Sequence, residues 1–290
     1  MPITVSIRDA NTLGGTVNDV ELLYAQLEQI PAADQYILDM SAVDFMRPYG
    51  VIALICAARR LATCANKLVL LENLLPAVHS YLHFMKLFEI GADFIHAAEP
   101  LNQVWQPAAT TPDQLHLTVA VNPASVEAIA AQAKSIFAHW LATSNLGNLL
   151  NVISELCANI YQHSGDAQGC ILIQKYKSRT RGRIEVRLAV GDLGHGIRGS
   201  LSARHKVVGQ EPLDYLLAAM QGMSARASGR GGMGLRRVEQ IVEAEGGYLW
   251  LRSETAAILS QGPGKVQEYR NLVYMPGTQV AVELHAPLRD

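Results

Sequence analysis

Glu155 and Asn159 are two polar residues placed four positions apart in the stretch LGNLLNVISELCANIYQHSG. The apolar residues of this stretch recur at spacings of three and four, which predicts an amphipathic helix from about Leu146 to His163. Residues four apart are neighbours on a helix face, so a carboxylate and an amide carbonyl would lie side by side. Such a pair can share a cation or a water molecule, and a solvated helix face is the alternative interpretation of the pair taken alone.

Another carboxylate, that of Asp192, is followed by Gly194 and Gly196 in the segment AVGDLGHGIRGS. The apolar residues before it predict a strand, so the carboxylate would stand at a strand end beside backbone that carries no side chains. A flat ligand can approach such a position closely. A glycine-rich turn that only closes the strand is the alternative.

A second glycine cluster, SGRGGMGLRRVEQIV, leads into an amphipathic helix that we expect from about Leu235 to Glu245. Backbone amides at a helix N-terminus suit phosphate oxygens, whereas a plain glycine-rich linker is the alternative. The pattern G-x-x-x-x-G-K-[ST] is absent from the sequence, so this cluster is not a Walker loop. Its glycines are Gly229, Gly231, Gly232 and Gly234.

The composition describes a globular protein, since 49% of the 290 residues are hydrophobic and 17% are charged. A net charge of -2 provides no general attraction for nucleic acid or for a membrane surface. The four cysteines form no C-x-x-C pair, and the longest apolar run, Val51 to Ala58, is far shorter than the ~20 residues of a membrane span. We therefore expect a cytoplasmic protein with no membrane segment and no direct nucleic-acid partner.

The pattern of strands and helices divides the chain into two domains. Strand-like and helix-like segments alternate through residues 1–97, which predicts an α/β domain with a parallel or mixed sheet. Residues 98–112 carry prolines and no periodic apolar face, so we interpret them as a linker. In residues 113–290 the strands cluster late, which favours an α+β two-layer sandwich with an antiparallel sheet. The elements expected there are strands at Ile171–Tyr176, Arg183–Val190, Tyr248–Arg252 and Gln279–His285, and a helix from Ser125, as N-cap, to Trp140.

Pro276-Gly277-Thr278 opens the last predicted strand and completes an ordered series of four features. The series resembles the GHKL (histidine-kinase-like) ATPase superfamily, and the match spans about Leu115 to Pro287. Glu155 and Asn159 match its N box, the Asp192 segment matches its first glycine box, and the second glycine cluster matches its second box. The resemblance implies a Bergerat-type ATP-binding fold for the C-terminal domain.

Within that superfamily, ISELCANIYQHSG is similar to the anti-sigma factor serine kinases, in which a His follows the Asn by four residues; here that residue is His163. The segment GRGGMGL, with Arg230 before the glycines, resembles the ATP lid of the same kinases. GLRRVEQIVEAEGGYLWLRSE also resembles sensor histidine kinases, but the residues upstream do not form their dimerisation helix pair with a phosphorylatable His. Autophosphorylation on histidine is therefore not expected.

The resemblance implies ATP and Mg²⁺ as cofactors and gives chemistry to three residues. Glu155 would polarise the attacking hydroxyl or water as a general base. Asn159 would hold Mg²⁺ through its carbonyl oxygen, and the metal would bridge the phosphates. Arg230 would reach the terminal phosphate and stabilise the charge that is transferred. Glu155 and Arg230 are thus the implied catalytic residues, and Asn159 is the implied metal ligand.

The other implied residues surround the nucleotide. Asp192 would accept a hydrogen bond from the exocyclic amine of adenine, and Thr278 would support the adenine region through water. We interpret the segment from Leu201 to Ser228, with its helix-like run LDYLLAAMQGM, as a lid that orders when nucleotide binds, and His195 and His205 as solvent-facing. The remaining implied nucleotide-binding residues are His163, Asn159, Gly194, Gly196, Gly229, Gly231, Gly232 and Gly234.

The stretch ILDMSAVDFMRPYGVIALICAARRL in the first domain resembles the STAS domain of anti-sigma factor antagonists. That family has an Asp and a phosphoacceptor Ser where this chain has Arg47-Pro48-Tyr49, so the transferable hydroxyl is missing unless Tyr49 substitutes. We therefore interpret this domain as a degenerate STAS-like interaction or regulatory module. Arg47 would attract an acidic or phosphorylated partner, with an exposed loop arginine as the alternative.

Two functions follow from the resemblance. The first is a cytosolic signalling regulator that transfers the γ-phosphate of ATP to Ser or Thr of a partner, such as a STAS-domain antagonist or a sigma factor. The second is a protein-interaction switch that binds ATP with little or no hydrolysis and controls partner docking. A scaffold with an inactive ATP pocket is a third alternative, and a homodimer remains open in each case.

Overall fold

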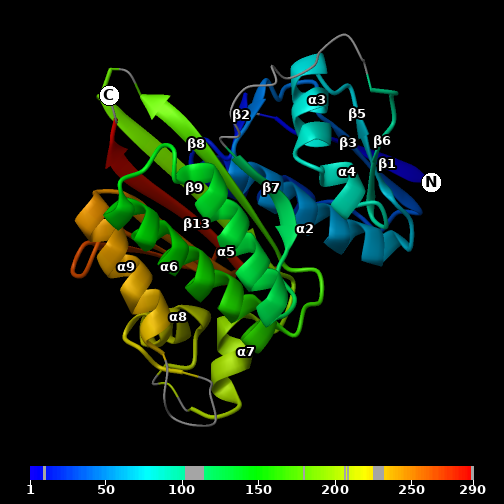
Figure 1. The fold of residues 1–290 in the computed structure, drawn as a ribbon. Coiled ribbons are helices and arrows are strands. Elements are labelled where there is room, and N and C mark those ends of the chain that lie inside the picture. The colour runs from blue at the N-terminus through cyan, green and yellow to red at the C-terminus, as the bar shows by residue number, and fades with distance from the viewer. Residues whose placement is uncertain are drawn as a thin grey trace. The chain divides into compact units, whose positions relative to one another are not determined.

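The computed structural model describes residues 1–8, 11–101, 114–178, 180–205, 207, 209–224 and 232–288. The chain divides into two compact units, Met1–Thr111 and Pro112–Asp290. Each unit has its own sheet, and Figure 1 colours the first from blue to cyan and the second from green to red. The predicted linker lies outside the described residues from residue 102 onward.

The first unit is built on a parallel sheet with the strand order β1-β3-β5-β6. Each crossover between these strands carries a helix, as parallel pairing requires. A short parallel pair, β2 with β4, lies outside this sheet. The strands are β1 (Pro2–Ser6), β2 (Thr12–Leu13), β3 (Gln35–Asp39), β4 (Phe45–Met46), β5 (Val69–Glu72) and β6 (Ile95–Ala97), and the helices are α1 (Val17–Glu28), α2 (Pro48–Ala65), α3 (Pro76–Phe84) and α4 (Leu87–Ile90).

Helix α2 forms much of the core of the first unit. It begins at Pro48 because the fixed φ of proline suits the first helical position, and it ends at Ala65, before the C-cap residue Asn66, which is left-handed with φ +52°. Among the described helices, α2 is the one that is long and apolar enough to cross a membrane by length and composition. Because 72% of it is buried inside the protein, its apolar surface is accounted for by core packing.

The N-terminus of α2 places Arg47 and Tyr49, the two residues that the resemblance to the STAS domain pointed to. Tyr49 is the second residue of α2 and is only 5% exposed. A phosphoacceptor hydroxyl has to meet its donor, so this burial argues against Tyr49 as a phosphoacceptor. Arg47 is half-buried as the N-cap residue, and its guanidinium lies 5.8 Å from the ring centroid of Phe45. It is therefore not a fully exposed loop arginine.

The second unit is built on an antiparallel sheet of seven strands in the order β12-β11-β10-β13-β9-β8-β7. Helices α5, α6 and α9 lie across one face of this sheet (Figure 1). Alternate strand residues, such as Leu188 and Val190 of β9, point toward these helices and share one buried core with them. The strands are β7 (Gln114–Val119), β8 (Cys170–Ser178), β9 (Arg183–Gly191), β10 (Tyr248–Glu254), β11 (Ala256–Ser260), β12 (Val266–Tyr269) and β13 (Met275–Pro287), and the helices are α5 (Pro123–Phe137), α6 (Thr143–Asn159) with the π turn η1 (Ile160–Ser164), α7 (Gly196–Ser202), α8 (Pro212–Met220) and α9 (Met233–Glu245).

The sequence pattern does not predict β11 and β12, which extend the sheet at one edge. Strands β10 and β11 are joined by Glu254 and Thr255, and Glu254 is left-handed with φ +55°. Two-residue hairpin turns need such positive φ values and usually take them from Asn or Gly. Because neither residue is present, the sequence gives no turn signal between the two strands.

Helix α5 starts and ends earlier than predicted. Its N-cap is Asn122, whose side-chain oxygen accepts a hydrogen bond from the Ser125 N–H at 2.8 Å. The prediction of Ser125 as N-cap is therefore wrong, because Ser125 is the third residue of the helix. The helix ends at Phe137, and Trp140 lies beyond it with its ring 3.3 Å from the Lys175 ammonium.

Gly277→Ala should destabilise the second unit, because Gly277 has φ +76° and an added Cβ would lie 2.1 Å from the carbonyl oxygen of Asp192. We expect the free energy of unfolding to fall by at least ~2 kcal/mol. Gly147→Ala is the control, since an added Cβ at this position in α6 meets nothing within 4 Å. Alanine there should stabilise the helix by about 0.5–1 kcal/mol.

Urea unfolding followed by tryptophan fluorescence measures both variants. Equal unfolding midpoints for the two would contradict the close backbone contact at Gly277.

Candidate functional site

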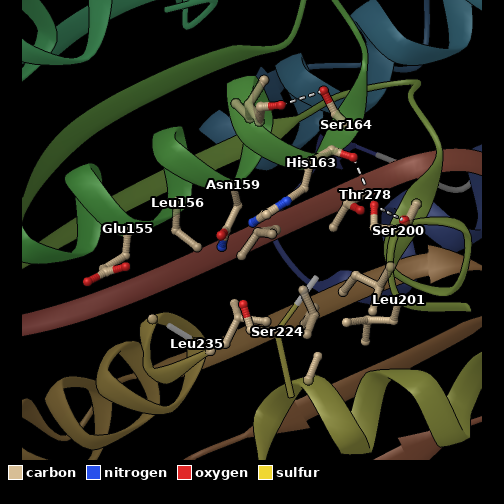
Figure 2. Close-up of a pocket in the computed structure, with 18 of the residues that line it drawn as sticks. Glu155, Leu156, Asn159, His163, Ser164, Ser200, Leu201, Ser224, Leu235 and Thr278 are labelled. Atoms are coloured by element: carbon tan, nitrogen blue, oxygen red, sulfur yellow. Dashed lines mark hydrogen bonds between the residues drawn. The ribbon is translucent and has the colours of Figure 1, made fainter. Parts of the chain in front are cut away.

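One cavity of the second unit is lined by most of the described residues that carry the predicted chemistry (Figure 2). The empty space inside it, counted out to the open mouth and so including open solvent, is about 1070 Å³. The lining residues come from α6 and its π turn, from β9 and the residue after it, from α7, from α8 and the residues after it, from the start of α9, from β10 and from β13. Those with predicted roles are Glu155, Asn159, His163, Asp192, Gly196, Gly232, Gly234 and Thr278.

Helix α6 supplies one wall of the cavity. Glu155, Asn159 and His163 follow one another on the helix side that faces the cavity (Figure 2). Their spacing places them together, while Ile153 points into the core, as the amphipathic pattern predicts. The α-helix changes into the π turn η1 directly after Asn159. Such single π turns occur frequently at functional sites.

Asp192 follows the last residue of β9 and is 4% exposed. Its backbone N–H donates to the Thr278 carbonyl oxygen at 3.0 Å, and its Oδ1 accepts a hydrogen bond from the Gly194 N–H at 2.9 Å. These contacts hold the carboxylate at the cavity wall. A carboxylate has about four acceptor positions, so it can accept from a ligand as well as from Gly194.

The two glycines after Asp192 differ in what they do. Gly196 lines the cavity and has φ +67°, a value that favours glycine. Gly194 is not among the lining residues. An added Cβ at Gly194 would lie 1.9 Å from the carbonyl oxygen of Ser164, so this glycine lets the loop pack against the π turn.

The first turn of α9 forms the opposite wall. Gly232 has φ +86°, and an added Cβ there would lie 1.9 Å from the carbonyl oxygen of Gly222. At Gly234 an added Cβ would lie 2.5 Å from Glu155 Oε2. The carboxylate therefore lies against a helix N-terminus, where the partial positive charge of the amides favours it. The N-cap residue, Gly232, has no side chain that could cap this helix start, so an anion can bind there.

The glycine cluster before α9 is only partly described. Gly229, Arg230 and Gly231 lie outside the described residues, so their contacts with phosphate stay predictions. Of the four glycines of the cluster, Gly232 and Gly234 can be placed at the cavity.

The segment from Leu201 to Ser228 is not a lid throughout its described part. Helix α8 is packed into the main core, where Leu216 is fully buried. His205 is half-buried, and its Nε2 lies 2.7 Å from the carbonyl oxygen of Ser224. The prediction that His205 faces solvent is therefore wrong, whereas His195 is exposed as predicted.

Several lining residues have no recognisable functional signal in the sequence. The Oγ of Ser200 lies 2.8 Å from the carbonyl oxygens of both His163 and Gly196, so Ser200 ties α7 to the π turn. The apolar lining residues follow strand alternation or helical spacing, which predicts burial and nothing more. An apolar interior with few polar groups is typical of small-molecule sites. The apolar residues are Leu156, Ile160, Val190, Ile197, Leu201, Ala219, Met223, Met233, Leu235, Leu251 and Val280.

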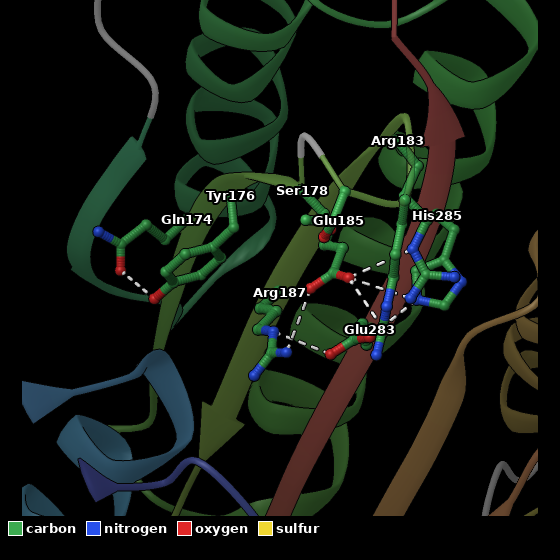
Figure 3. A network of polar contacts seen from close by, with 10 residues as sticks. Gln174, Tyr176, Ser178, Arg183, Glu185, Arg187, Glu283 and His285 are labelled. Atoms are coloured by element: carbon green, nitrogen blue, oxygen red, sulfur yellow. Dashed lines mark hydrogen bonds and ion pairs between the residues drawn. The ribbon is translucent and has the colours of Figure 1, made fainter.

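A separate polar cluster lies on β9 and β13 (Figure 3). Possible ligand atoms of Glu185, Glu283 and His285 lie within 4.8 Å of one another. Arg187 contacts Glu185 at 3.3 Å and Glu283 at 2.8 Å, and Arg183 contacts Glu185 at 3.0 Å. Burial raises the pKa of Glu185, but the hydrogen bond from Arg183 and the charge of Arg187 outweigh it, so the pKa is lowered. Because the guanidinium groups neutralise the carboxylates, we interpret the cluster as an ion-pair network and not as a metal centre.

Glu245 fixes the far end of the pair formed by α6 and α9. Its Oε1 accepts hydrogen bonds from the Asn145 Nδ2 at 3.1 Å and the Asn148 Nδ2 at 2.8 Å. The end of α9 thus meets the start of α6, while Gly234 meets Glu155, so the two helices run antiparallel. Burial raises the pKa of Glu245, and the two amide hydrogen bonds offset this only in part.

No protein-family model matches the chain, and no curated protein matches it either. The chemistry of the cavity therefore has to come from its own side chains. It combines a carboxylate at a strand end, a carboxylate and an amide on one helix face, and a helix N-terminus. Such a set can bind a ligand that carries hydrogen-bond donors at one end and negative charge at the other.

Glu245→Gln should stabilise the protein more at pH 7 than at pH 4. A raised pKa in the folded state means that stability is present while the carboxyl is protonated and is lost as the pH rises through that pKa. Glutamine stays neutral and keeps an oxygen that can accept from Asn145 and Asn148. The measurement is the free energy of unfolding of both proteins at the two pH values.

Glu243→Gln is the matched control, because this glutamate of α9 has a 43% exposed side chain. We expect the control to change stability little at either pH. A Glu245→Gln effect of the same size at pH 4 and pH 7 would contradict the role of burial.

Proposed function

We propose that the second unit binds ATP with Mg²⁺ in this cavity, and that the protein is a cytoplasmic signalling regulator of the GHKL type. In this proposal it resembles the anti-sigma factor serine kinases and transfers the γ-phosphate to Ser or Thr of a partner protein. The observation that carries the proposal is the convergence of Asp192, the face formed by Glu155 and Asn159, and the start of α9 on one cavity. An adenosine polyphosphate with bound Mg²⁺ offers the matching groups, namely the amino group of adenine, the metal ion and the phosphates.

The end of the cavity at Asp192 suits a base that carries an amino group. Thr278 lies beside Asp192 across the pair of β9 and β13. Val190 and Val280, two residues away on the same strands, supply an apolar surface for a ring. In the proposal, the Asp192 carboxylate accepts a hydrogen bond from the exocyclic amine of adenine.

The end of the cavity at α6 and α9 suits phosphates and a metal. The side-chain oxygen of Asn159 is a ligand type that Mg²⁺ accepts, and the first-turn amides of α9 can donate to phosphate oxygens. Bound Mg²⁺ would neutralise phosphate charge. In the proposal, Glu155 takes the proton of the acceptor Ser or Thr hydroxyl. The oxygen of that hydroxyl bonds to the γ-phosphorus, and the bond between the γ-phosphorus and the oxygen of the leaving ADP breaks.

The contact between Glu155 and α9 supports a non-catalytic switch as the second candidate, because it gives Glu155 a role that needs no chemistry. Glu155 Oε2 lies against Gly234 in the first turn of α9, and this contact stabilises the helix start whether or not phosphate is transferred. A protein with either function therefore has a physical use for Glu155. In the switch, ATP bound at the same helix start would control partner docking with little or no hydrolysis.

For the first unit we propose a degenerate STAS-like module that binds a partner and does not accept phosphate. The burial of Tyr49 supports this, because Tyr49 replaces the acceptor serine of the resembled motif. Half-buried Arg47 offers a cation to an acidic or phosphorylated segment. A STAS-domain antagonist or a sigma factor is the kind of partner proposed for the whole protein.

Asp192→Asn should weaken ATP binding about 10- to 100-fold, because an amide with two N–H donors replaces a charged acceptor at constant size. The control is Asp214→Asn, which removes the same charge from the first turn of α8, away from the cavity lining. Isothermal titration with ATP and Mg²⁺ measures both variants. Affinity equal to that of the unmutated protein in Asp192→Asn would contradict base recognition by Asp192.

Glu155→Gln should lower phosphate transfer to an added STAS-domain protein at least ~100-fold, because the general base is lost. We expect ATP affinity to stay within about twofold, since the side chain keeps its size and an oxygen. The transfer is measured as the amount of label that moves from labelled ATP to the partner protein. Glu127→Gln, on the exposed face of α5, is the control. Undiminished transfer in Glu155→Gln would remove Glu155 from the chemistry. If the unmutated protein transfers no phosphate but binds its partner with an affinity that depends on ATP, the switch is favoured.

A further inference from the structure

Ser253 of β10 joins two segments of the candidate site without lining the cavity itself. Its side chain is buried, with 2% of the residue exposed. The Oγ donates a hydrogen bond to the Gly277 carbonyl oxygen at 2.8 Å and accepts one from the Ile197 N–H at 3.1 Å. Gly277 directly precedes Thr278, and Ile197 lies in the first turn of α7. One hydroxyl therefore links the start of β13, at Gly277, to the end of the loop that follows Asp192.

The surroundings leave this hydroxyl little freedom. An added Cβ at Gly196 would lie 2.7 Å from the Ser253 Oγ, so the loop packs directly onto it. The next residue of β10, Glu254, forms an ion pair with Arg198 of α7 at 2.8 Å. Two consecutive residues of one strand thus fix the position at which α7 begins.

The two ends of the loop after β9 have different anchors. At its start, the Asp192 N–H donates to Thr278, and the Gln279 Nε2 donates to the Asp192 carbonyl oxygen at 3.2 Å. At its end, the hydrogen bond from Ile197 to Ser253 connects it to the sheet. Loss of the Ser253 hydroxyl would leave a partly buried N–H and a buried carbonyl without that partner, which is costly enough to shift the loop.

We infer that Ser253 is a positioning residue for the base end of the nucleotide site, holding the Asp192 loop and Thr278 at the separation that a base needs. The inference rests on the proposed function. Ser253 acts on the base end and not on the phosphate end, because its partners Gly277 and Ile197 belong to neither α6 nor α9. Its effect is therefore selective for one part of the ligand.

The experiment compares Ser253→Ala with Ser260→Ala. Ser260 is also a buried serine, on the neighbouring strand β11. Its Oγ donates to Glu239 at 2.6 Å, with the Gly262 carbonyl oxygen as a second acceptor at 3.3 Å, and accepts a hydrogen bond from the Gly262 N–H at 3.1 Å. Both variants lose a buried hydroxyl of the same kind. Thermal unfolding measures the stability of each variant, and competition titration measures the affinity for ATP, adenosine and inorganic tripolyphosphate. Ser253→Cys, which keeps a weak donor and acceptor, is measured beside them.

We expect Ser253→Ala to weaken the binding of ATP and of adenosine by a similar factor, about tenfold. The affinity for tripolyphosphate should stay within about twofold of that of the unmutated protein. Ser253→Cys should lie between Ser253→Ala and the unmutated protein, and Ser260→Ala should leave all three affinities unchanged. Unchanged ATP affinity in Ser253→Ala, an equal loss for tripolyphosphate, or the same losses in Ser260→Ala would overturn the inference. If the unmutated protein does not bind ATP, the proposed function fails and this inference fails with it.

Discussion

The backbone of Gly277 lies so close to the carbonyl oxygen of Asp192 that a Cβ in its place would be 2.1 Å from that oxygen. This contact continues the antiparallel pairing of β9 with β13, so Asp192 lies beside Thr278 of β13 at the point where β9 ends. The loop that follows Asp192 then packs against the π turn through Gly194. The position of the carboxylate thus depends on two places where the backbone approaches without side chains, and glycine is the residue that permits this.

The other wall of the cavity depends on an antiparallel pair of helices. Asn145 and Asn148 of α6 bind Glu245 at one end of the pair, and Glu155 lies against Gly234 at the other. Both helices also place their apolar faces in the core shared with the sheet. Because both ends of the pair are fixed, the polar face of α6 and the start of α9 keep a set separation. That separation is what the proposed phosphate end of the ligand requires.

Much of this arrangement could be predicted from local patterns. Helical spacing was sufficient to place Glu155 and Asn159 on one face of α6, and apolar alternation located β9 and β13 within a few residues. These predictions succeed because a helix or strand of that length has to bury one face, whatever its neighbours are.

The features that the sequence did not reveal depend on single residues or on distant contacts. Glu254 takes a left-handed conformation without being glycine, so the turn into β11 has no signal. The burial of Tyr49 and the packing of α8 into the core follow from tertiary contacts, which periodicity does not report. Ser253 likewise looks like an ordinary strand residue until its two hydrogen-bond partners, 24 and 56 residues away, are placed beside it.

The central claim is that the Asp192 carboxylate and the Asn159 amide face one ligand from opposite ends. A crystal structure of the protein with Mg²⁺ and a non-hydrolysable ATP analogue tests it most directly. We predict the exocyclic amine of adenine within hydrogen-bond distance of the Asp192 carboxylate, and Mg²⁺ bound by the Asn159 side-chain oxygen on the same nucleotide. A nucleotide that contacts only one of these two side chains, or that binds outside the cavity, would contradict the claim.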